Sequence, residues 1–379
     1  MPKKILRIVI MVMLIMLLPA TALAADDLSL ECKSALLMDG NSGEILYEQN
    51  SDEKCYPASV TKLMTLTLIL EAVDAGTISL DDLVSVSEEA ASMGGSQVYL
   101  YPGEQRTVDE MLIAIAVGSG NDAAYAMAEY LGGTVQGFAD MMNKRAKELG
   151  MNNTNFVNPH GLHDENHYTT AHDLGLLAHH AVHVPLMLDY TSIYEYEFRP
   201  EPHLLTLWNT NRLLKWYEGT DGLKTGYTEE AGRNLVATAQ RDGMRLISVV
   251  LGAQERRGHF SQSMTLLNYG FNKYEYVSLH KAGEVIAQAP ISKGKVDYVA
   301  LTVANDIGYS QAKGENGEIR ESIELVPNLQ APLKAGDIGG RIIIYRDGQE
   351  LTSADLLLMD DAPQGGLWHT WGKLLSMIW

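Results

Sequence analysis

Between residues 25 and 276 the hydrophobic positions alternate, then recur with helical spacing, and then alternate again. Alternation over short runs predicts strands, and recurrence every three or four positions over longer runs predicts helices. The order of strands, helices and strands predicts one α+β domain, an antiparallel sheet with a helical cluster. The predicted strands are Ser34 to Asp39, Glu44 to Glu48, Leu235 to Gln240 and Arg245 to Leu251, and the predicted helices are one that begins at Pro57 and Val108 to Val117, Asp122 to Leu131, Val135 to Leu149 and Ala171 to Val182.

Turn residues and helix stops support these elements. Gly40-Asn41-Ser42-Gly43 joins the first two predicted strands and Asp242-Gly243 joins the last two, as is typical of β-hairpins. The helix that begins at Pro57 is apolar on nearly all sides and ends near Gly76, so we expect it to lie inside the core. Lys224-Thr225-Gly226 precedes the second hairpin, which is consistent with an edge strand.

Helical periodicity disappears beyond Tyr276. Val296 to Val303, Ile323 to Val326 and Arg341 to Tyr345 read as short strands separated by Gly, Asn, Asp and Pro turns. Asp347-Gly348 is a further tight-turn signal. We therefore predict that residues 25–276 form the first domain and residues 277–362 a separate small all-β domain.

The first 24 residues predict a cleaved signal peptide. Three basic residues precede an unbroken apolar run from Ile8 to Leu18, and Ala22-Leu23-Ala24 supplies the small-residue cleavage pattern. The alternative is an uncleaved anchor, but eleven apolar residues are too few to span a bilayer as a helix. We therefore expect the chain to be exported.

The last residues, 363–379, predict a short amphipathic helix. Trp368, Trp371, Leu375 and Ile378 recur every three or four positions, and three of the five tryptophans lie in this segment. Indole rings prefer the lipid headgroup boundary, and the segment is too short and polar to span a bilayer. We expect peripheral attachment to the outer face of the cell membrane, the alternative being that the tryptophans pack against the β domain.

Charge and cysteine content narrow the possible partners. Without residues 1–24 the chain has 26 basic against 48 acidic side chains, a formal charge of −22. Because no cluster of Lys and Arg interrupts this acidity, nucleic acid is not expected as a partner. Cys32 and Cys55 are the only cysteines, and export permits a disulfide between them, but the sequence leaves their pairing open.

Ser59-Val60-Thr61-Lys62 carries the first candidate chemistry. Ser59 lies at the start of the apolar helix, where free backbone N–H groups and the helix dipole favour a developing negative charge. Lys62 lies one turn on, on the same helix face, so its neutral amine could take the Ser59 hydroxyl proton. The lysine pKa of about 10.4 must then fall by about three units, through burial and a second cation such as Lys224. The structural alternatives are a helix N-cap and a solvated lysine.

Two further motifs follow. The first begins at Ser119, 60 residues after Ser59, and the second begins at Lys224, 105 residues after Ser119. Ser119-Gly120-Asn121 falls between two predicted helices, where Ser119 can relay a proton and Asn121 can hold a substrate amide, unless the motif merely caps the second helix. On the edge strand, Lys224 and Thr225 can meet a carboxylate, and Gly226 permits close backbone approach, unless this segment is only a turn. Each motif alone is weak, but their order, spacing and context match the active-site set of penicillin-binding proteins and serine β-lactamases.

The sequence resembles one family over the whole length from about Leu30 to the C-terminus. The family is the low-molecular-mass penicillin-binding proteins, the serine-type D-alanyl-D-alanine carboxypeptidases of peptidase family S11. The resemblance includes its C-terminal β domain. The matching segments are Tyr56-Pro57-Ala58-Ser59-Val60-Thr61-Lys62-Leu63-Met64-Thr65, Ser119-Gly120-Asn121-Asp122-Ala123, Asn158-Pro159-His160-Gly161-Leu162 and Asp221-Gly222-Leu223-Lys224-Thr225-Gly226-Tyr227-Thr228.

The resemblance implies a two-step acyl transfer on the peptidoglycan stem peptide. Ser59 would attack the D-Ala-D-Ala carbonyl, D-alanine would leave, and water would hydrolyse the acyl-enzyme. The backbone N–H groups of Ser59 and Tyr227 would form the oxyanion hole. Penicillin and other β-lactams would acylate Ser59 as well, because penicillin is similar to the acyl-D-Ala-D-Ala end. The resemblance implies no metal and no organic cofactor.

One position departs from the family pattern. The family commonly has an arginine just before the equivalent of Phe260, where this chain has His259. Arg256 or Arg257 is then a candidate to replace it. The departure leaves open which residue, besides Lys224 and Thr225, binds the terminal carboxylate.

Other functions fit the sequence less well. His160, His163, His167, His179, His180 and His183 could suggest zinc, but H-E-x-x-H is absent and we expect surface or loop roles. A serine β-lactamase would need a deacylating carboxylate from an E-x-x-L-N type loop between Asn121 and Lys224, and the sequence has none. A non-catalytic cell-wall binding protein on the same fold would not be expected to keep all three motifs intact.

Overall fold

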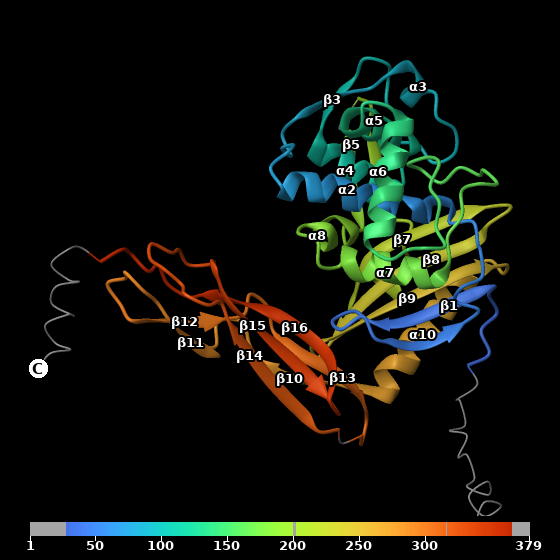
Figure 1. Ribbon diagram of the computed structural model, residues 1–379. Coiled ribbons are helices and arrows are strands. Elements are labelled where there is room, and N and C mark those ends of the chain that lie inside the picture. Colours follow the sequence, from blue (N-terminus) through green and yellow to red (C-terminus); the bar gives the residue numbers. More distant parts are fainter. Residues whose placement is uncertain (1–27, 200–201, 316, 366–379) are drawn as a thin grey trace, which may run out of the picture. The chain divides into compact units, whose positions relative to one another are not determined.

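The computed structural model describes residues 28–199, 202–315 and 317–365. The first domain contains a five-stranded sheet in the order β2-β1-β9-β8-β7, and all neighbouring strands are antiparallel (Figure 1). Both predicted hairpins are confirmed, and the segment with Lys224 is the edge strand β7. The strands are β1 (Ser34–Asp39), β2 (Ile45–Gln49), β7 (Thr220–Thr228), β8 (Gly232–Arg241) and β9 (Met244–Ala253).

Helices dominate the chain between β2 and β7, as predicted. The four predicted helices with stated ends are confirmed to within one residue at each end. Two short strand pairs, and a helix after β9, were not predicted. The elements are η1 (Ala58–Thr61), α2 (Lys62–Asp74), β3 (Leu83–Ser85), α3 (Glu88–Ala91), β4 (Gln105–Thr107), α4 (Val108–Ala116), α5 (Asn121–Gly132), α6 (Val135–Glu148), α7 (Ala171–Ala181), α8 (Met187–Thr191), β5 (Glu195–Arg199), β6 (Leu205–Trp208), α9 (Leu213–Trp216) and α10 (Gly258–Lys273).

Helices cover the sheet on both faces. Successive side chains of a strand point to opposite faces, so Leu36 and Met38 lie on one face of β1 and Leu37 on the other. The first two lie next to Gly175 of α7, and Leu37 lies next to Gly270 of α10. The sheet is therefore the middle layer of the domain.

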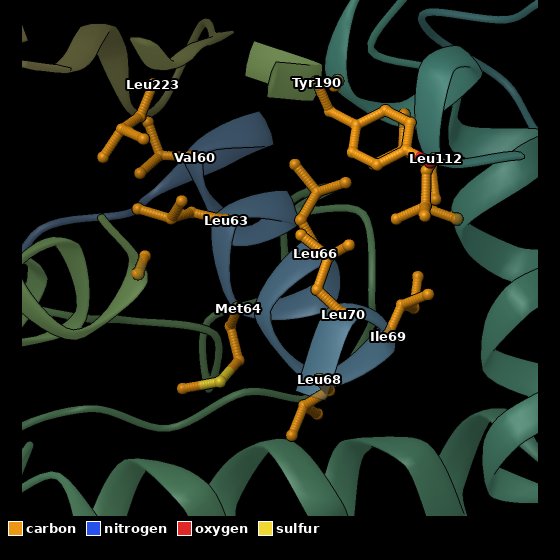
Figure 2. Close-up of a cluster of buried hydrophobic side chains, with 14 of the residues drawn as sticks. Val60, Leu63, Met64, Leu66, Leu68, Ile69, Leu70, Leu112, Tyr190 and Leu223 are labelled. Carbon is orange, nitrogen blue, oxygen red and sulfur yellow. The ribbon is translucent and has the colours of Figure 1, made fainter. Parts of the chain in front are cut away.

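The helix α2 occupies the centre of the main core. Its first nine residues, from Lys62 to Leu70, are all buried. Figure 2 shows its side chains among Leu112 of α4, Tyr190 of α8 and Leu223 of β7. A helix that is apolar on nearly all sides can bury all of its side chains only at the centre of a core. The position of α2 therefore agrees with the prediction. The consequence is that the start of α2 is fixed by packing beside the edge strand.

The chain beyond α10 is rich in strands and has its own hydrophobic core. Five strands form a sheet in the order β11-β12-β16-β15-β14, and β10 pairs with β13. At the predicted turn, Asp347 and Gly348 have φ values of 52° and 84°, and positive values at both residues are what a two-residue hairpin needs. The strands are β10 (Tyr274–His280), β11 (Ala287–Pro290), β12 (Tyr298–Thr302), β13 (Ile307–Ala312), β14 (Ile319–Leu325), β15 (Ile338–Arg346) and β16 (Gln349–Leu358).

These elements confirm the predicted fold class, while the domain boundaries stay predictions. The three predicted C-terminal strands overlap β12, β14 and β15, and the strand β10 crosses the predicted boundary after Tyr276. The predicted signal peptide lies outside the described residues, and so does the predicted C-terminal helix beyond Gly365. Within the described residues, no helix has the length and apolar character needed to cross a membrane.

Candidate active site

The turn η1 presents Ser59 to the edge strand β7. A Cβ added to Gly226 of β7 would lie 2.7 Å from the Pro57 oxygen and 3.0 Å from the Ser59 nitrogen. Only glycine permits so close an approach of two backbones. The predicted reason for glycine in the Lys224-Thr225-Gly226 motif therefore has a geometric basis.

Lys62 lies directly behind Ser59 and is completely buried. Its Nζ is 3.0 Å from Ser59 Oγ, 2.6 Å from Asn121 Oδ1 and 2.8 Å from the His160 carbonyl oxygen. The two predicted catalytic residues are thus in contact, and the solvated-lysine alternative is wrong. Asn121 Nδ2 donates to the Gly94 carbonyl at 2.6 Å, so the Asn121 oxygen is the atom that faces Lys62.

Electrostatics favour the neutral form of Lys62. Burial is the largest cause, and the charge of Lys224 is the second, so the pKa of Lys62 lies well below its usual value, although Asp122 opposes the shift. Burial also lowers the pKa of Lys224 to about 7. Burial and the charge of Lys224 together disfavour the proton on Lys62, which supplies a neutral amine next to Ser59.

The second motif connects α4 to α5 and brings Asn121 to Lys62 and Ser119 to the pocket next to Ser59. Ser119 lines the same pocket as Ser59 and has a φ of 57°, an uncommon value for serine. Asn121 begins α5, and its amide bridges Lys62 and Gly94. Neither side chain caps α5, because its N-cap is Gly120 and has no side-chain hydrogen bond.

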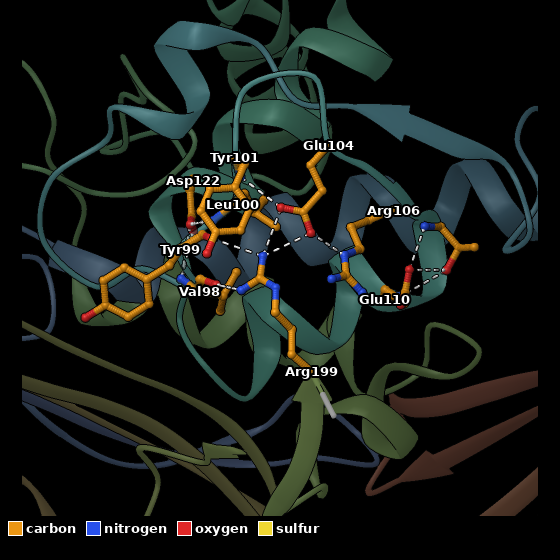
Figure 3. Close-up of polar contacts among 10 residues, drawn as sticks. Val98, Tyr99, Leu100, Tyr101, Glu104, Arg106, Glu110, Asp122 and Arg199 are labelled. Atoms are coloured by element: carbon orange, nitrogen blue, oxygen red, sulfur yellow. Dashed lines mark hydrogen bonds and ion pairs between the residues drawn. The ribbon is translucent and has the colours of Figure 1, made fainter. Parts of the chain in front are cut away.

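A loop before α4 supports this motif, and sequence reasoning missed it. The Asp122 carboxylate accepts from the Val98 and Leu100 N–H groups, and Arg199 donates to the carbonyl oxygens of Val98 and Tyr99 (Figure 3). Arg199 also pairs with Glu104 at 2.9 Å. These buried polar contacts hold the loop that carries Ser96, a residue of the pocket.

The Asn158-Pro159-His160-Gly161-Leu162 segment packs against the other side of α2. The His160 carbonyl accepts from Lys62, and a Cβ on Gly161, whose φ is +86°, would overlap the Ala58 carbonyl oxygen. Burial first, and then the charge of Lys62, lower the pKa of His160 to about 3. Its role is therefore a loop role, as predicted, with a neutral and buried ring.

His167 is hydrogen-bonded to the η1 turn. Its Nδ1 accepts from the Val157 N–H, so Nε2 carries the proton and donates to Thr61 Oγ1 at 2.7 Å. Burial lowers the pKa of His167 to about 4, and the ring is neutral at pH 7. His167 thus lies in a loop, as predicted, and its side chain is buried.

Asn234 is a second supporting residue that the sequence did not reveal. Its Nδ2 donates to the carbonyl oxygens of Tyr56 and Pro57, and its Oδ1 accepts from the Gly252 N–H. This buried amide ties the turn before Ser59 to the neighbouring strands β8 and β9. Its partners lie 177 and 178 positions away, so no local pattern could have indicated it.

A pocket of about 390 Å³ opens in front of Ser59. Thr225, Gly226 and Tyr227 line it, and Thr225 Oγ1 donates to Thr210 at 2.6 Å. Lys224, Lys62 and Asn121 are buried and are not among the residues that line it. The lining residues are Ser59, Ser96, Ser119, Thr210, Arg212, Trp216, Thr225, Gly226, Tyr227, Arg233, Arg257, His259 and Phe260.

The cysteines are not paired with each other, and the histidines that the structure describes do not form a metal site. Cys32 and Cys55 are free, and burial raises the pKa of each thiol to about 11. In the described part of the chain, no group of three or more His, Cys, Asp or Glu side chains could hold a metal ion.

The central helix, the antiparallel sheet and the Ser59–Lys62 pair define a serine acyl-transfer enzyme of the penicillin-binding-protein class. The family model for D-alanyl-D-alanine carboxypeptidase, peptidase S11, matches residues 20–255. The model for the C-terminal domain of penicillin-binding protein 5 matches residues 274–364. The chain therefore belongs to the peptidase S11 family and is a serine-type D-alanyl-D-alanine carboxypeptidase.

Individual relatives agree with this assignment. The chain is 41% identical to the D-alanyl-D-alanine carboxypeptidase DacF of Bacillus subtilis (strain 168) over 344 residues, which is 90% of this chain and 88% of the relative. It is 35% identical to penicillin binding protein 5 from Haemophilus influenzae, with a TM-score of 0.68 over 89% of this chain and 98% of that structure. It is also 35% identical to penicillin-binding protein D2 from Listeria monocytogenes in the ampicillin-bound form, with a TM-score of 0.58 over 65% of this chain and 99% of that structure.

Proposed function

We propose that this carboxypeptidase removes the terminal D-alanine from peptidoglycan stem peptides through an acyl-enzyme on Ser59. The single observation that carries this proposal is the set of three contacts of Lys62. A neutral amine has two N–H groups and one lone pair. Asn121 Oδ1 and the His160 carbonyl can only accept hydrogen bonds, so they take the two N–H groups. The lone pair is left for the third neighbour, the hydroxyl of Ser59.

The steps follow from this arrangement. Ser59 Oγ bonds to the carbonyl carbon of the penultimate D-alanine while its proton passes to Lys62 Nζ. The C–N bond then breaks, the proton reaches the leaving amine through Ser119, and D-alanine departs. A water molecule attacks the ester in the second step and restores the Ser59 hydroxyl. The backbone N–H groups of Ser59 and Tyr227 stabilise the oxyanion in both steps.

Of the remaining predicted site residues, Asn121, Thr225 and Gly226 bind the substrate in this proposal. Asn121 uses one N–H and one lone pair internally, and it retains one of each for a substrate amide. Thr225 and Gly226 line the pocket beside Ser59, where the substrate backbone must lie. Lys224 acts through its charge on Lys62.

We further propose that penicillin acylates Ser59. The support is the ampicillin-bound form of the Listeria monocytogenes relative, together with the chemistry of an activated serine next to an amide-binding strand.

The test of the function is mass spectrometry of a stem pentapeptide after incubation with the full-length protein. We expect the loss of one alanine and an equivalent amount of free D-alanine. Intact pentapeptide, or cleavage at another bond, would contradict the proposal.

Lys224 offers a pH-dependent test. Its charge lowers the pKa of Lys62, so Lys224→Gln should raise that pKa. The pH at which the acylation rate begins to rise should then be higher in the variant. Because Lys224 itself has a pKa of about 7, its charge acts fully only below that pH, and the largest difference is expected there. Rates of labelling by a fluorescent penicillin between pH 5 and pH 9 measure this shift. If the acylation rate rises at the same pH in both proteins, the charge of Lys224 does not affect the pKa of Lys62.

We propose that the protein is exported after cleavage of residues 1–24 and held at the outer face of the cell membrane by residues 363–379. The support is the pattern of the two terminal sequences. The domain division at residues 25–276 and 277–362 belongs to the same proposal, supported by the separate hydrophobic cores of the two parts.

Deleting residues 365–379 should release active enzyme from liposomes. Apolar insertion does not depend on charge, so binding of the full-length protein should change little between low and high salt. Co-sedimentation with liposomes measures both effects, and the exchange of Thr370 and Ser376 for alanine is the matched control on the predicted polar side. A truncated protein that still co-sediments would rule out the anchor.

A further inference from the structure

The pocket in front of Ser59 has an unusual concentration of positive charge for so acidic a protein. Three arginines line it, and none of them makes an ion pair within the part of the chain that the structure describes. Each guanidinium instead lies over an aromatic ring: Arg212 over Tyr194 at 6.0 Å, Arg233 over Tyr227 at 4.5 Å and Arg257 over Trp216 at 5.3 Å. Unpaired arginines around one pocket indicate an anionic ligand.

A buried donor without a partner distinguishes Arg233 from the other two arginines. Arg257 is exposed, so water can solvate its charge, and Arg212 donates to the Tyr194 hydroxyl at 3.0 Å. Arg233 is half-buried, and its Nε is a buried donor without a hydrogen-bond partner among the described residues. A buried donor that is left unpaired is costly, so Arg233 is the arginine of the three whose hydrogen-bonding capacity is least satisfied within the described structure.

His259 has a second unpaired ring nitrogen, next to Arg233. It lines the pocket, only 9% of the residue is exposed, and its Nδ1 is buried without a partner in the described structure. Burial first, and then the neighbouring Arg233 charge, lower the pKa of His259 to about 4. The ring is therefore neutral at pH 7 and can donate from Nδ1 without adding a second charge to the site.

The sheet register places this pair beside the reacting serine. Arg233 of β8 lies opposite Tyr227 of β7, one position along from Gly226, and Gly226 touches the Ser59 backbone. In a peptide that ends in D-Ala-D-Ala, the terminal carboxyl carbon is within about 3 Å of the scissile nitrogen. The group next to the bond that Ser59 attacks is therefore a carboxylate, and Arg233 and His259 line the same pocket as Ser59.

We infer that Arg233 and His259 together form the site for the terminal carboxylate of the substrate. Arg233 supplies the charge and His259 Nδ1–H supplies a second, neutral donor. This inference rests on the proposed function, and it replaces the expectation that Arg256 or Arg257 takes this role. Arg256 does not line the pocket, and Arg257 lies at its exposed edge.

The experiment measures binding in a Ser59→Ala background, so that it needs no turnover. The probes are one peptide that ends in D-Ala-D-Ala with a free carboxylate and the same peptide with a C-terminal amide. We expect calorimetry to show the acid bound about tenfold to a hundredfold more tightly than the amide. Adding Arg233→Ala should bring this ratio close to one, while Arg233→Lys, which keeps the charge but not the fork of donors, should give an intermediate ratio.

Two matched variants test the assignment to these residues. Arg257→Ala removes the same charge from the same pocket, and we expect it to leave the acid-to-amide ratio within about twofold of the parent. His259→Ala should lower the ratio about threefold to tenfold, and His259→Gln, which restores an N–H donor, should recover part of it. An unchanged ratio in Arg233→Ala, or a collapse in Arg257→Ala, would overturn the inference. Release of D-alanine by the wild-type protein tests the proposed function separately, because the ratio does not depend on turnover.

Discussion

Ser59→Ala abolishes both the release of D-alanine and covalent labelling by penicillin. The reason is chemical, because no other hydroxyl of the described structure lies within hydrogen-bond distance of Lys62 Nζ. Loss of the nucleophile in a serine hydrolase lowers the rate on the order of 10⁶-fold, so turnover should fall below detection. The measurement is fluorescence of the protein band after incubation with a labelled penicillin, with mass spectrometry of the pentapeptide in parallel.

The matched control is Ser96→Ala, which removes a hydroxyl from the same pocket. The Ser96 backbone oxygen, not its side chain, accepts from Asn121, so this variant should still be labelled. Thermal unfolding of both variants shows whether the fold is intact. Labelling that persists in a folded Ser59→Ala protein would assign the nucleophile to another residue.

The sequence predicted the parts of the fold that follow from local patterns. The apolar helix α2 has no polar face, so only a central position is available to it, and the serine at its start is placed with it. The turn residues of the two hairpins predicted the pairing of β1 with β2 and of β8 with β9. These predictions needed no knowledge of distant contacts.

Features that depend on distant contacts were missed. Residues 258–273 form α10, although this stretch has two glycines and three aromatic residues, which have modest helix propensity. Its packing against β8 and β9 supplies the stability that the local sequence lacks. Asn234 and Arg199 likewise serve backbone groups far away in the sequence, and their roles become visible only when the chain is folded.

The candidate site was predicted as a set of residues but not as a geometry. The motifs identified Lys62, Ser119 and Lys224, but they did not reveal that Lys224 is buried and lies outside the pocket lining. The pocket's cations are instead arginines from β8 and from the loops before α9 and α10. Strand register and burial decide such placements, and neither can be read from a three-residue motif.

Lys62→Ala should slow acylation of the protein by about 10²-fold to 10⁴-fold, as expected when a general base is lost. The side chain contacts Ser59 Oγ at 3.0 Å, and its lone pair is the only proton acceptor that the three contacts leave for the hydroxyl. Stopped-flow measurement of penicillin acylation gives the rate. The substitution also leaves the His160 carbonyl without its donor, so we expect a loss of about 1–3 kcal/mol in the free energy of unfolding.

The variant Lys62→Arg distinguishes two roles of Lys62, that of a proton acceptor and that of a positive charge. A guanidinium stays protonated at every pH at which the protein is folded, so it can donate to Asn121 and His160 but cannot take the Ser59 proton. If Lys62 is the base, Lys62→Arg is as slow as Lys62→Ala, and raising the pH restores neither variant. If Lys62 only positions its neighbours through a positive charge, Lys62→Arg keeps much of the wild-type rate. The acylation rate of a folded Lys62→Arg protein therefore decides between the two roles, and a rate near that of the wild type would remove Lys62 from the proton transfer.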